Sequence, residues 1–277
     1  MIRKRINIVF LVPILLSFVA CKKDSAGDSS IPSDFKLSYG DSILYEKSVG
    51  ADNLVYPQHS YAGSYSGFPE GIEIDEKTGA INLSKSETGL RYRINFIADD
   101  NSFEYTTTVL LSGVNYFDAF YYLSKNDTVA NAIYNGNPNN TIPISPAGTV
   151  FDIGLGCNNE GIAVSTADGK INLMQTIRNG FFGRYPDNAT RKEFELKYKI
   201  NDQSQQREKS LKIKLYYFNT IDDVTADLRQ LLRDREGTIF GANPITFPGE
   251  ILSSPSGADG VAKVAKPRPP CIFIIGR

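Results

Sequence analysis

Alternation of apolar and polar residues predicts two matching sets of strands. Apolar side chains occupy every second position over residues 92–98 and again over residues 194–200, alternating with Arg91, Arg93 and Asn95 in the first run and with glutamates and lysines in the second. Each run leads through a polar turn to another alternating run, at 103–111 and at 211–217. A period of two residues puts the apolar side chains on one face of a strand. The pattern therefore predicts two half-buried β-hairpins in separate parts of the chain.

A shorter segment is also used twice. Residues 71–83 recur without a gap as residues 161–173, ninety residues later. In both copies two apolar residues alternate with polar neighbours, a polar turn follows, and the alternation resumes after a glycine. Gly79 and Gly169 stand where such a turn needs a positive φ, a conformation that glycine adopts without strain. The segment is therefore predicted to be a tight hairpin in each copy.

The two kinds of repeat together define a fold class. Each copy of the tight hairpin is followed by its own pair of longer alternating strands, in the same order. Several short half-buried strands separated by turns are typical of a β-sandwich. We therefore predict a mainly β protein with two tandem β-sandwiches, the first over residues 34–118 and the second over residues 119–220.

Residues 221–277 depart from the repeat. Four apolar residues fall at i, i+4, i+7 and i+8 from Val224, with acidic residues before them and arginines after them. This spacing predicts one amphipathic α-helix, whose short apolar stripe is expected to dock on the second sandwich. The chain after it is rich in Gly, Pro, Ser and Ala, which predicts an irregular tail.

The tail ends in a β-prone apolar run at residues 271–275, Cys-Ile-Phe-Ile-Ile. An exposed run of this kind is an aggregation hazard, so it has to be covered. We expect it to add a final strand to a sheet edge. The alternative is a tail that recognises a partner.

The hairpin segment resembles a known family. Residues 68–81 read Phe-Pro-Glu-Gly-Ile-Glu-Ile-Asp-Glu-Lys-Thr-Gly-Ala-Ile, and the second copy has Asn159 in place of the proline and Asp168 in place of the threonine. This pattern is similar to the immunoglobulin-like and cadherin-like repeats of bacterial surface proteins, including Bacteroidota lipoproteins. The resemblance implies that both sandwiches are immunoglobulin-like and that the protein works at a surface, and it implies no ligand.

The first residues of the chain predict export. Arg3, Lys4 and Arg5 precede an apolar run at residues 8–20, which is too short to span a bilayer. The small Ala20 followed by Cys21 looks like the lipobox of bacterial lipoproteins. We therefore expect residues 1–20 to be a signal peptide, Cys21 to carry the lipid, and residues 21–33 to form a flexible tether. The resulting localisation is the cell envelope, anchored by lipid, with the outer membrane favoured.

Two cysteines remain if Cys21 is acylated. Cys157 and Cys271 form an even pair, and disulfides persist in exported proteins. They are a candidate disulfide. Two separate buried thiols are the alternative, because the sequence does not give the distance between them.

Charge and motifs exclude several classes of function. Without the leader the chain has 27 basic side chains against 31 acidic ones, with no large block of one sign, so nucleic acid is not expected as a partner. The single histidine, His59, stands in a polar stretch. Motifs of nucleophile elbows, phosphate loops and zinc proteases are missing. We expect no catalytic residues and no cofactor, and a hydrolase with paired carboxylates is the less favoured alternative.

Metal binding is also not expected. Asp99-Asp100-Asn101 and Asp234-Arg235-Glu236 superficially match the calcium ligands of cadherin-like repeats. The second of these falls in the predicted helix, and no Asp-rich linker joins the two repeats. Calcium needs six to eight converging oxygen ligands. Turn acids and helix charges account better for these residues.

Aromatic residues supply the candidate binding sites. The chain has 15 Tyr and no Trp, and aromatic faces suit the stacking of sugars. Two groups fall in predicted loops, where sandwich folds often place recognition. They are Tyr56, Tyr61 and Tyr65 in the first repeat and Phe181, Phe182 and Tyr185 in the second.

The function predicted from these features is non-enzymatic adhesion or ligand display at the cell envelope. The partners are a membrane, reached through the N-terminal lipid, and a glycan or another envelope or cell-surface protein. The alternative function is a glycan-binding accessory lipoprotein of a polysaccharide-uptake system.

Overall fold

The computed structural model describes residues 35–47, 52–101, 103–144, 148–235 and 269–277. The chain divides into two compact units, residues 1–35 and residues 36–277, and the account below concerns the second unit. The predicted signal peptide, Cys21 and the tether at 21–33 lie outside the described residues.

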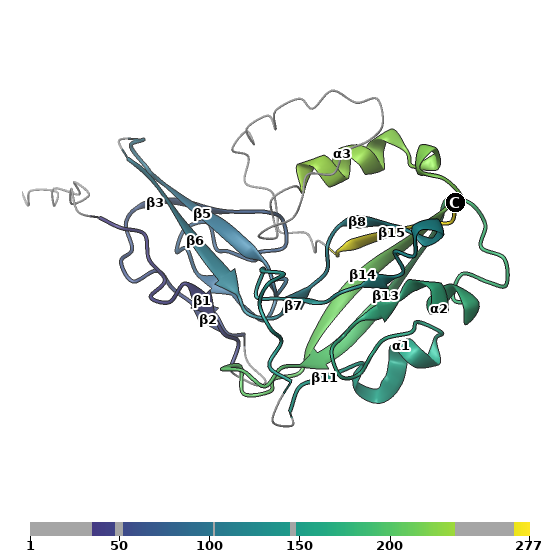
Figure 1. The fold of residues 1–277 in the computed structure, drawn as a ribbon. Helices are drawn as coiled ribbons and strands as arrows, with labels where there is room; N and C mark the ends of the chain where they lie inside the picture. The colour runs from purple at the N-terminus through teal and green to yellow at the C-terminus, as the bar shows by residue number, and fades with distance from the viewer. Residues whose placement is uncertain (1–34, 48–51, 102, 145–147, 236–268) are drawn as a thin grey trace, which may run out of the picture. The chain divides into compact units, whose positions relative to one another are not determined.

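The first domain is built on a four-stranded sheet (Figure 1). Its strand β1 runs parallel to β6, and the remaining pairs are antiparallel. A separate two-stranded sheet pairs β2 with β4. In sheet order the strands are β1 (Ile43–Leu44), β6 (Glu104–Leu111), β5 (Arg91–Ala98) and β3 (Gly63–Phe68), followed by the pair β2 (Leu54–Val55) and β4 (Ile81–Asn82).

The second domain is built on a five-stranded sheet with the order β11-β13-β14-β15-β8. Two small sheets, β10 with β7 and β12 with β9, complete it. Its strands are β7 (Val114–Asn115), β8 (Ala119–Tyr122), β9 (Val129–Ala130), β10 (Ile133–Tyr134), β11 (Val150–Phe151), β12 (Ile171–Asn172), β13 (Thr190–Lys199), β14 (Lys209–Phe218) and β15 (Cys271–Ile275). Val114 and Tyr116, which the sequence assigned to the first domain, lie in the core of the second.

The predicted alternation governs the long strands. Tyr92, Ile94 and Phe96 on β5 are fully buried, whereas Arg93 between them is exposed. On β13 the same alternation buries Leu196. The mainly β class is therefore confirmed, and the several sheets are consistent with β-sandwiches. The immunoglobulin-like topology stays a prediction.

Helical segments in the second domain were not predicted. Two α-helices, α1 (Gly156–Asn159) and α2 (Leu173–Arg178), flank the repeated hairpin. The Asn172 side chain caps α2 by accepting a hydrogen bond from the Gln175 N–H at 2.9 Å. Short 3-10 helices stand at η1 (Leu123–Lys125), η2 (Ile153–Leu155) and η3 (Ile221–Asp223). The second copy therefore carries short helices in addition to its strands.

The two repeated hairpins have matching backbone hydrogen bonds. In the first, the Asp75 N–H donates to the Ala80 carbonyl at 2.9 Å, and in the second the Ser165 N–H donates to the Lys170 carbonyl at 2.8 Å. The turn glycine has φ of 70° at Gly79 and 71° at Gly169. The predicted tight turn is thus present in both copies.

An aromatic ring lies against each of these turns. A Cβ atom at Gly79 would stand 2.7 Å from the Tyr65 ring, and one at Gly169 would stand 2.6 Å from the Phe151 ring. The hydroxyl of Tyr39 donates to the Gly79 carbonyl, and the hydroxyl of Tyr116 donates to the Gly169 carbonyl. The repeat therefore extends from sequence to individual packing contacts.

The helix α3 (Ala226–Asp234) is the amphipathic helix that the sequence predicted. Its residue Leu232 is fully buried, in a cluster with Phe218 and Phe273 of the five-stranded sheet. Cys157 of α1 and Leu173 of α2 belong to a different cluster, which includes other side chains of the same sheet. The helix α3 thus covers one face of the sheet, and α1 and α2 lie on the other (Figure 1).

The final strand corrects the sequence prediction. Strand β15 is not at a sheet edge, because it runs parallel to both β14 and β8 and lies between them. Each of its five residues is at most 1% exposed. Its side chains alternate, with Ile272 and Ile274 in the core that includes α1 and α2 and with Phe273 in the core under α3. It is a central strand.

Candidate functional site

The structure divides the predicted aromatic sites into exposed and buried residues. Tyr56 is 57% exposed and Tyr185 is 79% exposed. Tyr65, in contrast, is 1% exposed and is part of strand β3. Phe181 and Phe182 are buried in the core of the second domain. These three buried rings cannot stack on a ligand.

The remaining candidates belong to different domains. Tyr61 is partly buried, so Tyr56 is the exposed ring of the first group. In the second group the guanidinium of Arg184 lies over the Tyr185 ring, 5.5 Å from its centroid. Tyr185 is therefore the most accessible aromatic side chain among the described residues.

A surface hollow of about 360 Å³ lies beside the second hairpin. Its polar lining is already engaged within the protein. The amide of Asn158 donates to the Asp152 carboxylate at 2.6 Å, and Lys170 forms an ion pair with Asp168 at 2.7 Å. The Gln175 amide donates to Asn179 at 2.7 Å. These bonds explain the local structure without a ligand.

The candidate disulfide is contradicted by the structure. Cys157 and Cys271 are both free thiols and both buried. They belong to different hydrophobic clusters, on opposite faces of the five-stranded sheet. Burial raises the pKa of the Cys157 thiol to about 12 and also raises the pKa of Cys271. Both therefore stay protonated at neutral pH.

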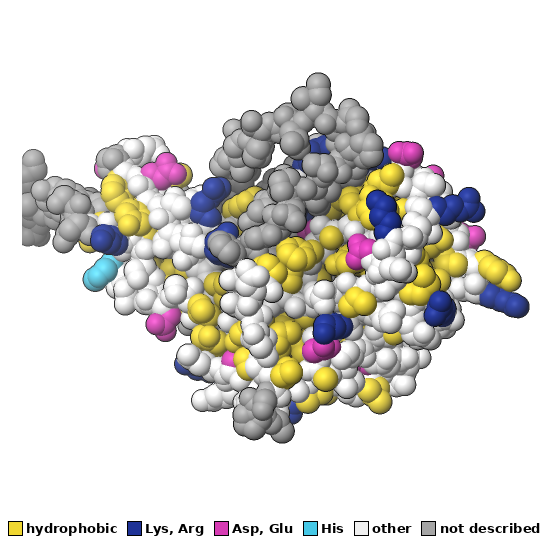
Figure 2. Space-filling view, viewed as in Figure 1, with side chains coloured by type: hydrophobic (Ala, Val, Ile, Leu, Met, Phe, Trp, Pro, Cys, Tyr) yellow, Lys and Arg dark blue, Asp and Glu magenta, His cyan; other side chains and the backbone are white. Residues whose placement is uncertain are grey.

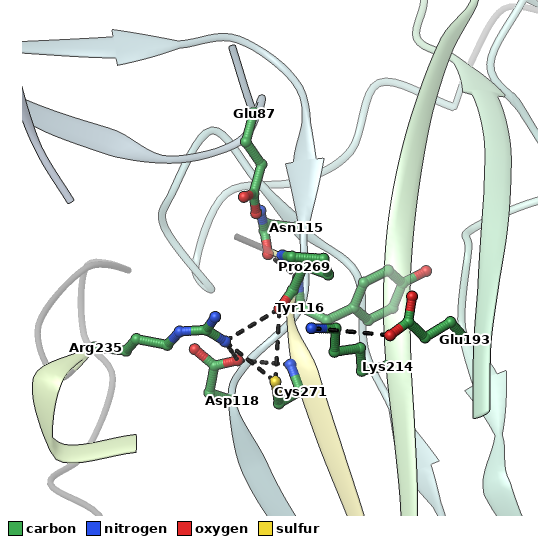
Figure 3. Close-up of polar contacts among 9 residues, drawn as sticks. All are labelled: Glu87, Asn115, Tyr116, Asp118, Glu193, Lys214, Arg235, Pro269 and Cys271. Carbon is green, nitrogen blue, oxygen red and sulfur yellow. Dashed lines mark hydrogen bonds and ion pairs between the residues drawn. The ribbon is translucent and has the colours of Figure 1, made fainter. Parts of the chain in front are cut away.

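A polar cluster fixes the beginning of β15 (Figure 3). Arg235, directly after α3, forms an ion pair with Asp118 at 3.5 Å, and these side chains are 12% and 6% exposed. The Arg235 guanidinium also donates to the Pro269 carbonyl at 3.1 Å. The carboxylate of Asp118 accepts the Cys271 N–H at 2.6 Å. We call these four residues the strand clamp, because they join three segments that are far apart in the sequence.

A second polar cluster joins the two domains. Glu46 of the first domain and Arg207 of the second form an ion pair at 2.9 Å, with side chains 9% and 20% exposed. The Ser112 hydroxyl donates to the Asp202 carboxylate at 3.0 Å, and the buried Lys209 ammonium donates to the Ser112 carbonyl at 2.7 Å. We call this set the domain junction.

The domain junction continues through buried uncharged groups. The hydroxyls of Tyr198 and Thr88 are hydrogen-bonded at 2.7 Å, and Tyr198 also accepts the Val114 N–H at 3.2 Å. The Asn115 amide donates to Glu87 at 2.8 Å (Figure 3). Burial raises the pKa of Tyr198 to about 12. Buried polar groups of this kind keep a defined geometry because separation would leave them unpaired.

Charge on the surface is mixed. Figure 2 shows basic and acidic side chains interspersed on the face drawn, and no block of one sign. His59 is exposed. Among the described residues no group of three or more His, Cys, Asp or Glu side chains could hold a metal ion. No helix in the described part of the chain is long and apolar enough to cross a membrane.

Both polar clusters were missed by sequence reasoning. Glu46 and Arg207 are 161 residues apart, and Asp118 and Cys271 are 153 residues apart. Lone charged residues at such separations carry no local pattern. The one signal that bears on them is Arg235 at the end of an amphipathic helix, which the sequence analysis assigned to helix charge.

Comparisons with known proteins give little beyond this geometry. No family model matches the chain, and no curated protein matches it. Among solved structures the chain is similar to the crystal structure of Drosophila N-cadherin EC1-4, with 11% identity and a TM-score of 0.20. That match covers 62% of this chain and 47% of the other, so the chain spans less than half of the N-cadherin structure. The sheets themselves define a mainly β protein in which the repeated hairpin occurs twice.

Proposed function

We propose that this protein is a non-enzymatic, lipid-anchored protein of the cell envelope that displays two β-domains for adhesion or ligand binding. The observation that carries the proposal is the domain junction. It joins the domains through a largely buried ion pair between Glu46 and Arg207 and through buried hydrogen bonds at Tyr198 and Lys209. Such contacts favour a fixed arrangement of the two domains, because independent motion would leave these buried polar groups unpaired.

A fixed arrangement of the two domains suits a protein that presents its loops to a partner. Loops on two domains that do not move independently keep a constant separation, which allows both to engage one partner or to hold a ligand site away from a membrane. The attachment itself rests on the sequence, through the basic residues, the apolar run and Ala20-Cys21 at the start of the chain. Tyr56 and Tyr185, the most exposed rings, are the first residues to test for contact with a ligand.

The first experiment measures lipid labelling and membrane association. Cells that produce the full chain or its Cys21→Ser variant are grown with labelled palmitate, fractionated, and treated with protease from outside. We expect label and membrane association for the full chain and their loss in Cys21→Ser. Unlabelled protein in the soluble fraction in both cases would contradict the lipid anchor.

The same preparations are then screened against glycans and for turnover. Saturable glycan binding that is lost in Tyr185→Ala and kept in Leu155→Ala would favour the accessory role in polysaccharide uptake. Leu155 is a suitable control because it is also an exposed apolar residue, at 49%. Bond cleavage would contradict the non-enzymatic proposal.

A further inference from the structure

The strand β15 is an addition to the plan of the repeat. In the first domain the first strand, β1, pairs directly and in parallel with the last strand, β6, with Ile43 opposite Leu110. In the second domain the corresponding strands β8 and β14 are not paired with each other. Strand β15 lies between them and is parallel to both, with Phe273 opposite Tyr216 on one side and opposite Phe120 on the other.

The inserted strand fills a slot that cannot stay empty. Its five residues are at most 1% exposed, and they contribute to the hydrophobic clusters on both faces of the sheet. Without the strand, β8 and β14 would each expose an unpaired edge, and both cores would be open to water. Every folded copy therefore needs a strand in this position.

The connection to β15 does not restrict which copy supplies the strand. The chain passes out of the described part after Arg235 and returns at Pro269, and these two residues are hydrogen-bonded at 3.1 Å. The 33 residues between 235 and 269 are many more than such a contact needs. A chain of that length can reach up to about 110 Å. A strand delivered to a neighbouring copy would make the same contacts as one that returns to its own.

We propose that the slot between β8 and β14 is a binding site for the Cys271–Ile275 strand of a second copy, so that the protein forms strand-exchanged dimers or longer assemblies. The closed and exchanged forms have the same pairing and differ in their connections. The exchanged form is therefore favoured by high local concentration. The proposal does not depend on lipid attachment.

The test uses the register of β14 and β15. Lys214 lies opposite Cys271, and Cα atoms on neighbouring strands are close enough for a disulfide. The acceptor is the full chain with Lys214→Cys and Cys271→Ser. The donor is a mass-tagged full chain that keeps Lys214 and Cys271. Both carry Cys21→Ser and Cys157→Ala, so that no other thiol remains.

Donor and acceptor are unfolded together, refolded over a range of concentrations and oxidised. We expect a disulfide-linked heterodimer whose fraction rises about tenfold for a tenfold rise in protein concentration in the dilute range. The matched control acceptor carries Lys212→Cys with Cys271→Ser. Residue 212 is on the same strand but does not pair with β15, and this control should give no heterodimer above random collision.

A single chain with Lys214→Cys and native Cys271 shows whether the reporter pair works. It should form the bond within one chain at low concentration. If that bond forms and no heterodimer appears at any concentration, or if the Lys212→Cys control gives as much heterodimer, the proposal is overturned.

Discussion

Tyr65 and Phe151 occupy the same place in the two copies of the repeat. Each ring lies against the turn glycine of its hairpin, and each backbone N–H donates to the hairpin, to Glu76 at 2.7 Å and to Thr166 at 2.9 Å. They differ by one hydroxyl. The Tyr65 hydroxyl is buried and has no hydrogen-bond partner among the described residues. The second copy thus shows that a ring in this place can pack against the turn without a hydroxyl.

This difference predicts a stabilising substitution. Tyr65→Phe removes an unpaired buried hydroxyl and should raise the free energy of unfolding by about 1 kcal/mol. The reciprocal change, Phe151→Tyr, should lower it, because the added hydroxyl would be buried at the same place. Urea denaturation of both variants measures the two effects. A loss of stability in Tyr65→Phe would mean that its hydroxyl makes a stabilising contact.

Single residues also mark where sequence reasoning was limited. Tyr65 was placed in a loop because Gly63, Ser64, Ser66 and Gly67 surround it, but these residues form strand β3. Pairing with β5 outweighs the low strand propensity of glycine. Phe181 and Phe182 are indeed in a loop, and yet they are buried, because the loop folds over the core of the second domain.

At the scale of elements, local sequence patterns were sufficient to predict strands whose pairing partners are near in sequence. The alternating runs gave β5, β6, β13 and β14, and the apolar stripe gave α3. The position of β15 could not be obtained in this way. Its apolar run predicts a covered strand, but nothing local says that β8 and β14 are separated to receive it. The strand clamp shows how the structure holds that long-range pairing.

The strand clamp is expected to control the opening of β15. Arg235→Ala leaves the Asp118 carboxylate buried without its cation, which should cost about 3 to 5 kcal/mol. Hydrogen exchange of the β15 amides should accelerate strongly in this variant. The control is Lys85→Ala, at the exposed ion pair with Asp52, which should leave exchange in β15 unchanged. Equal exchange in both variants would show that the strand clamp does not hold the strand.

For the whole molecule, buried tyrosines predict the response to alkaline pH. Burial raises the pKa of six of them above the ordinary value of 10.0, to about 12 for Tyr198. The others are Tyr39, Tyr116, Tyr121, Tyr134 and Tyr216. Above pH 10 the unfolded chain loses protons that the folded chain keeps, so deprotonation favours unfolding. Their stabilising contribution is complete below pH 10 and is lost as the pH rises towards the folded pKa values.

The thermal midpoint should therefore fall steeply between about pH 10 and about pH 12. Lys209 acts in the opposite direction, because burial lowers its pKa and the folded chain therefore loses this proton at a lower pH than the unfolded chain does. It is one lysine against six tyrosines. Thermal unfolding followed by circular dichroism, with tyrosinate absorbance as a second signal, measures the effect. A midpoint that does not change over this range would contradict the burial of these hydroxyls.

The central position of β15 also sets an order of events during synthesis. All the described strands of the first domain lie before residue 112, so that domain can fold before the end of the chain has emerged. The second domain pairs Ala119 with Ile272, and its sheet stays open until residue 275 has emerged. Until then the apolar strands of a half-finished sheet are exposed to other chains, over the 153 residues that separate Asp118 from Cys271.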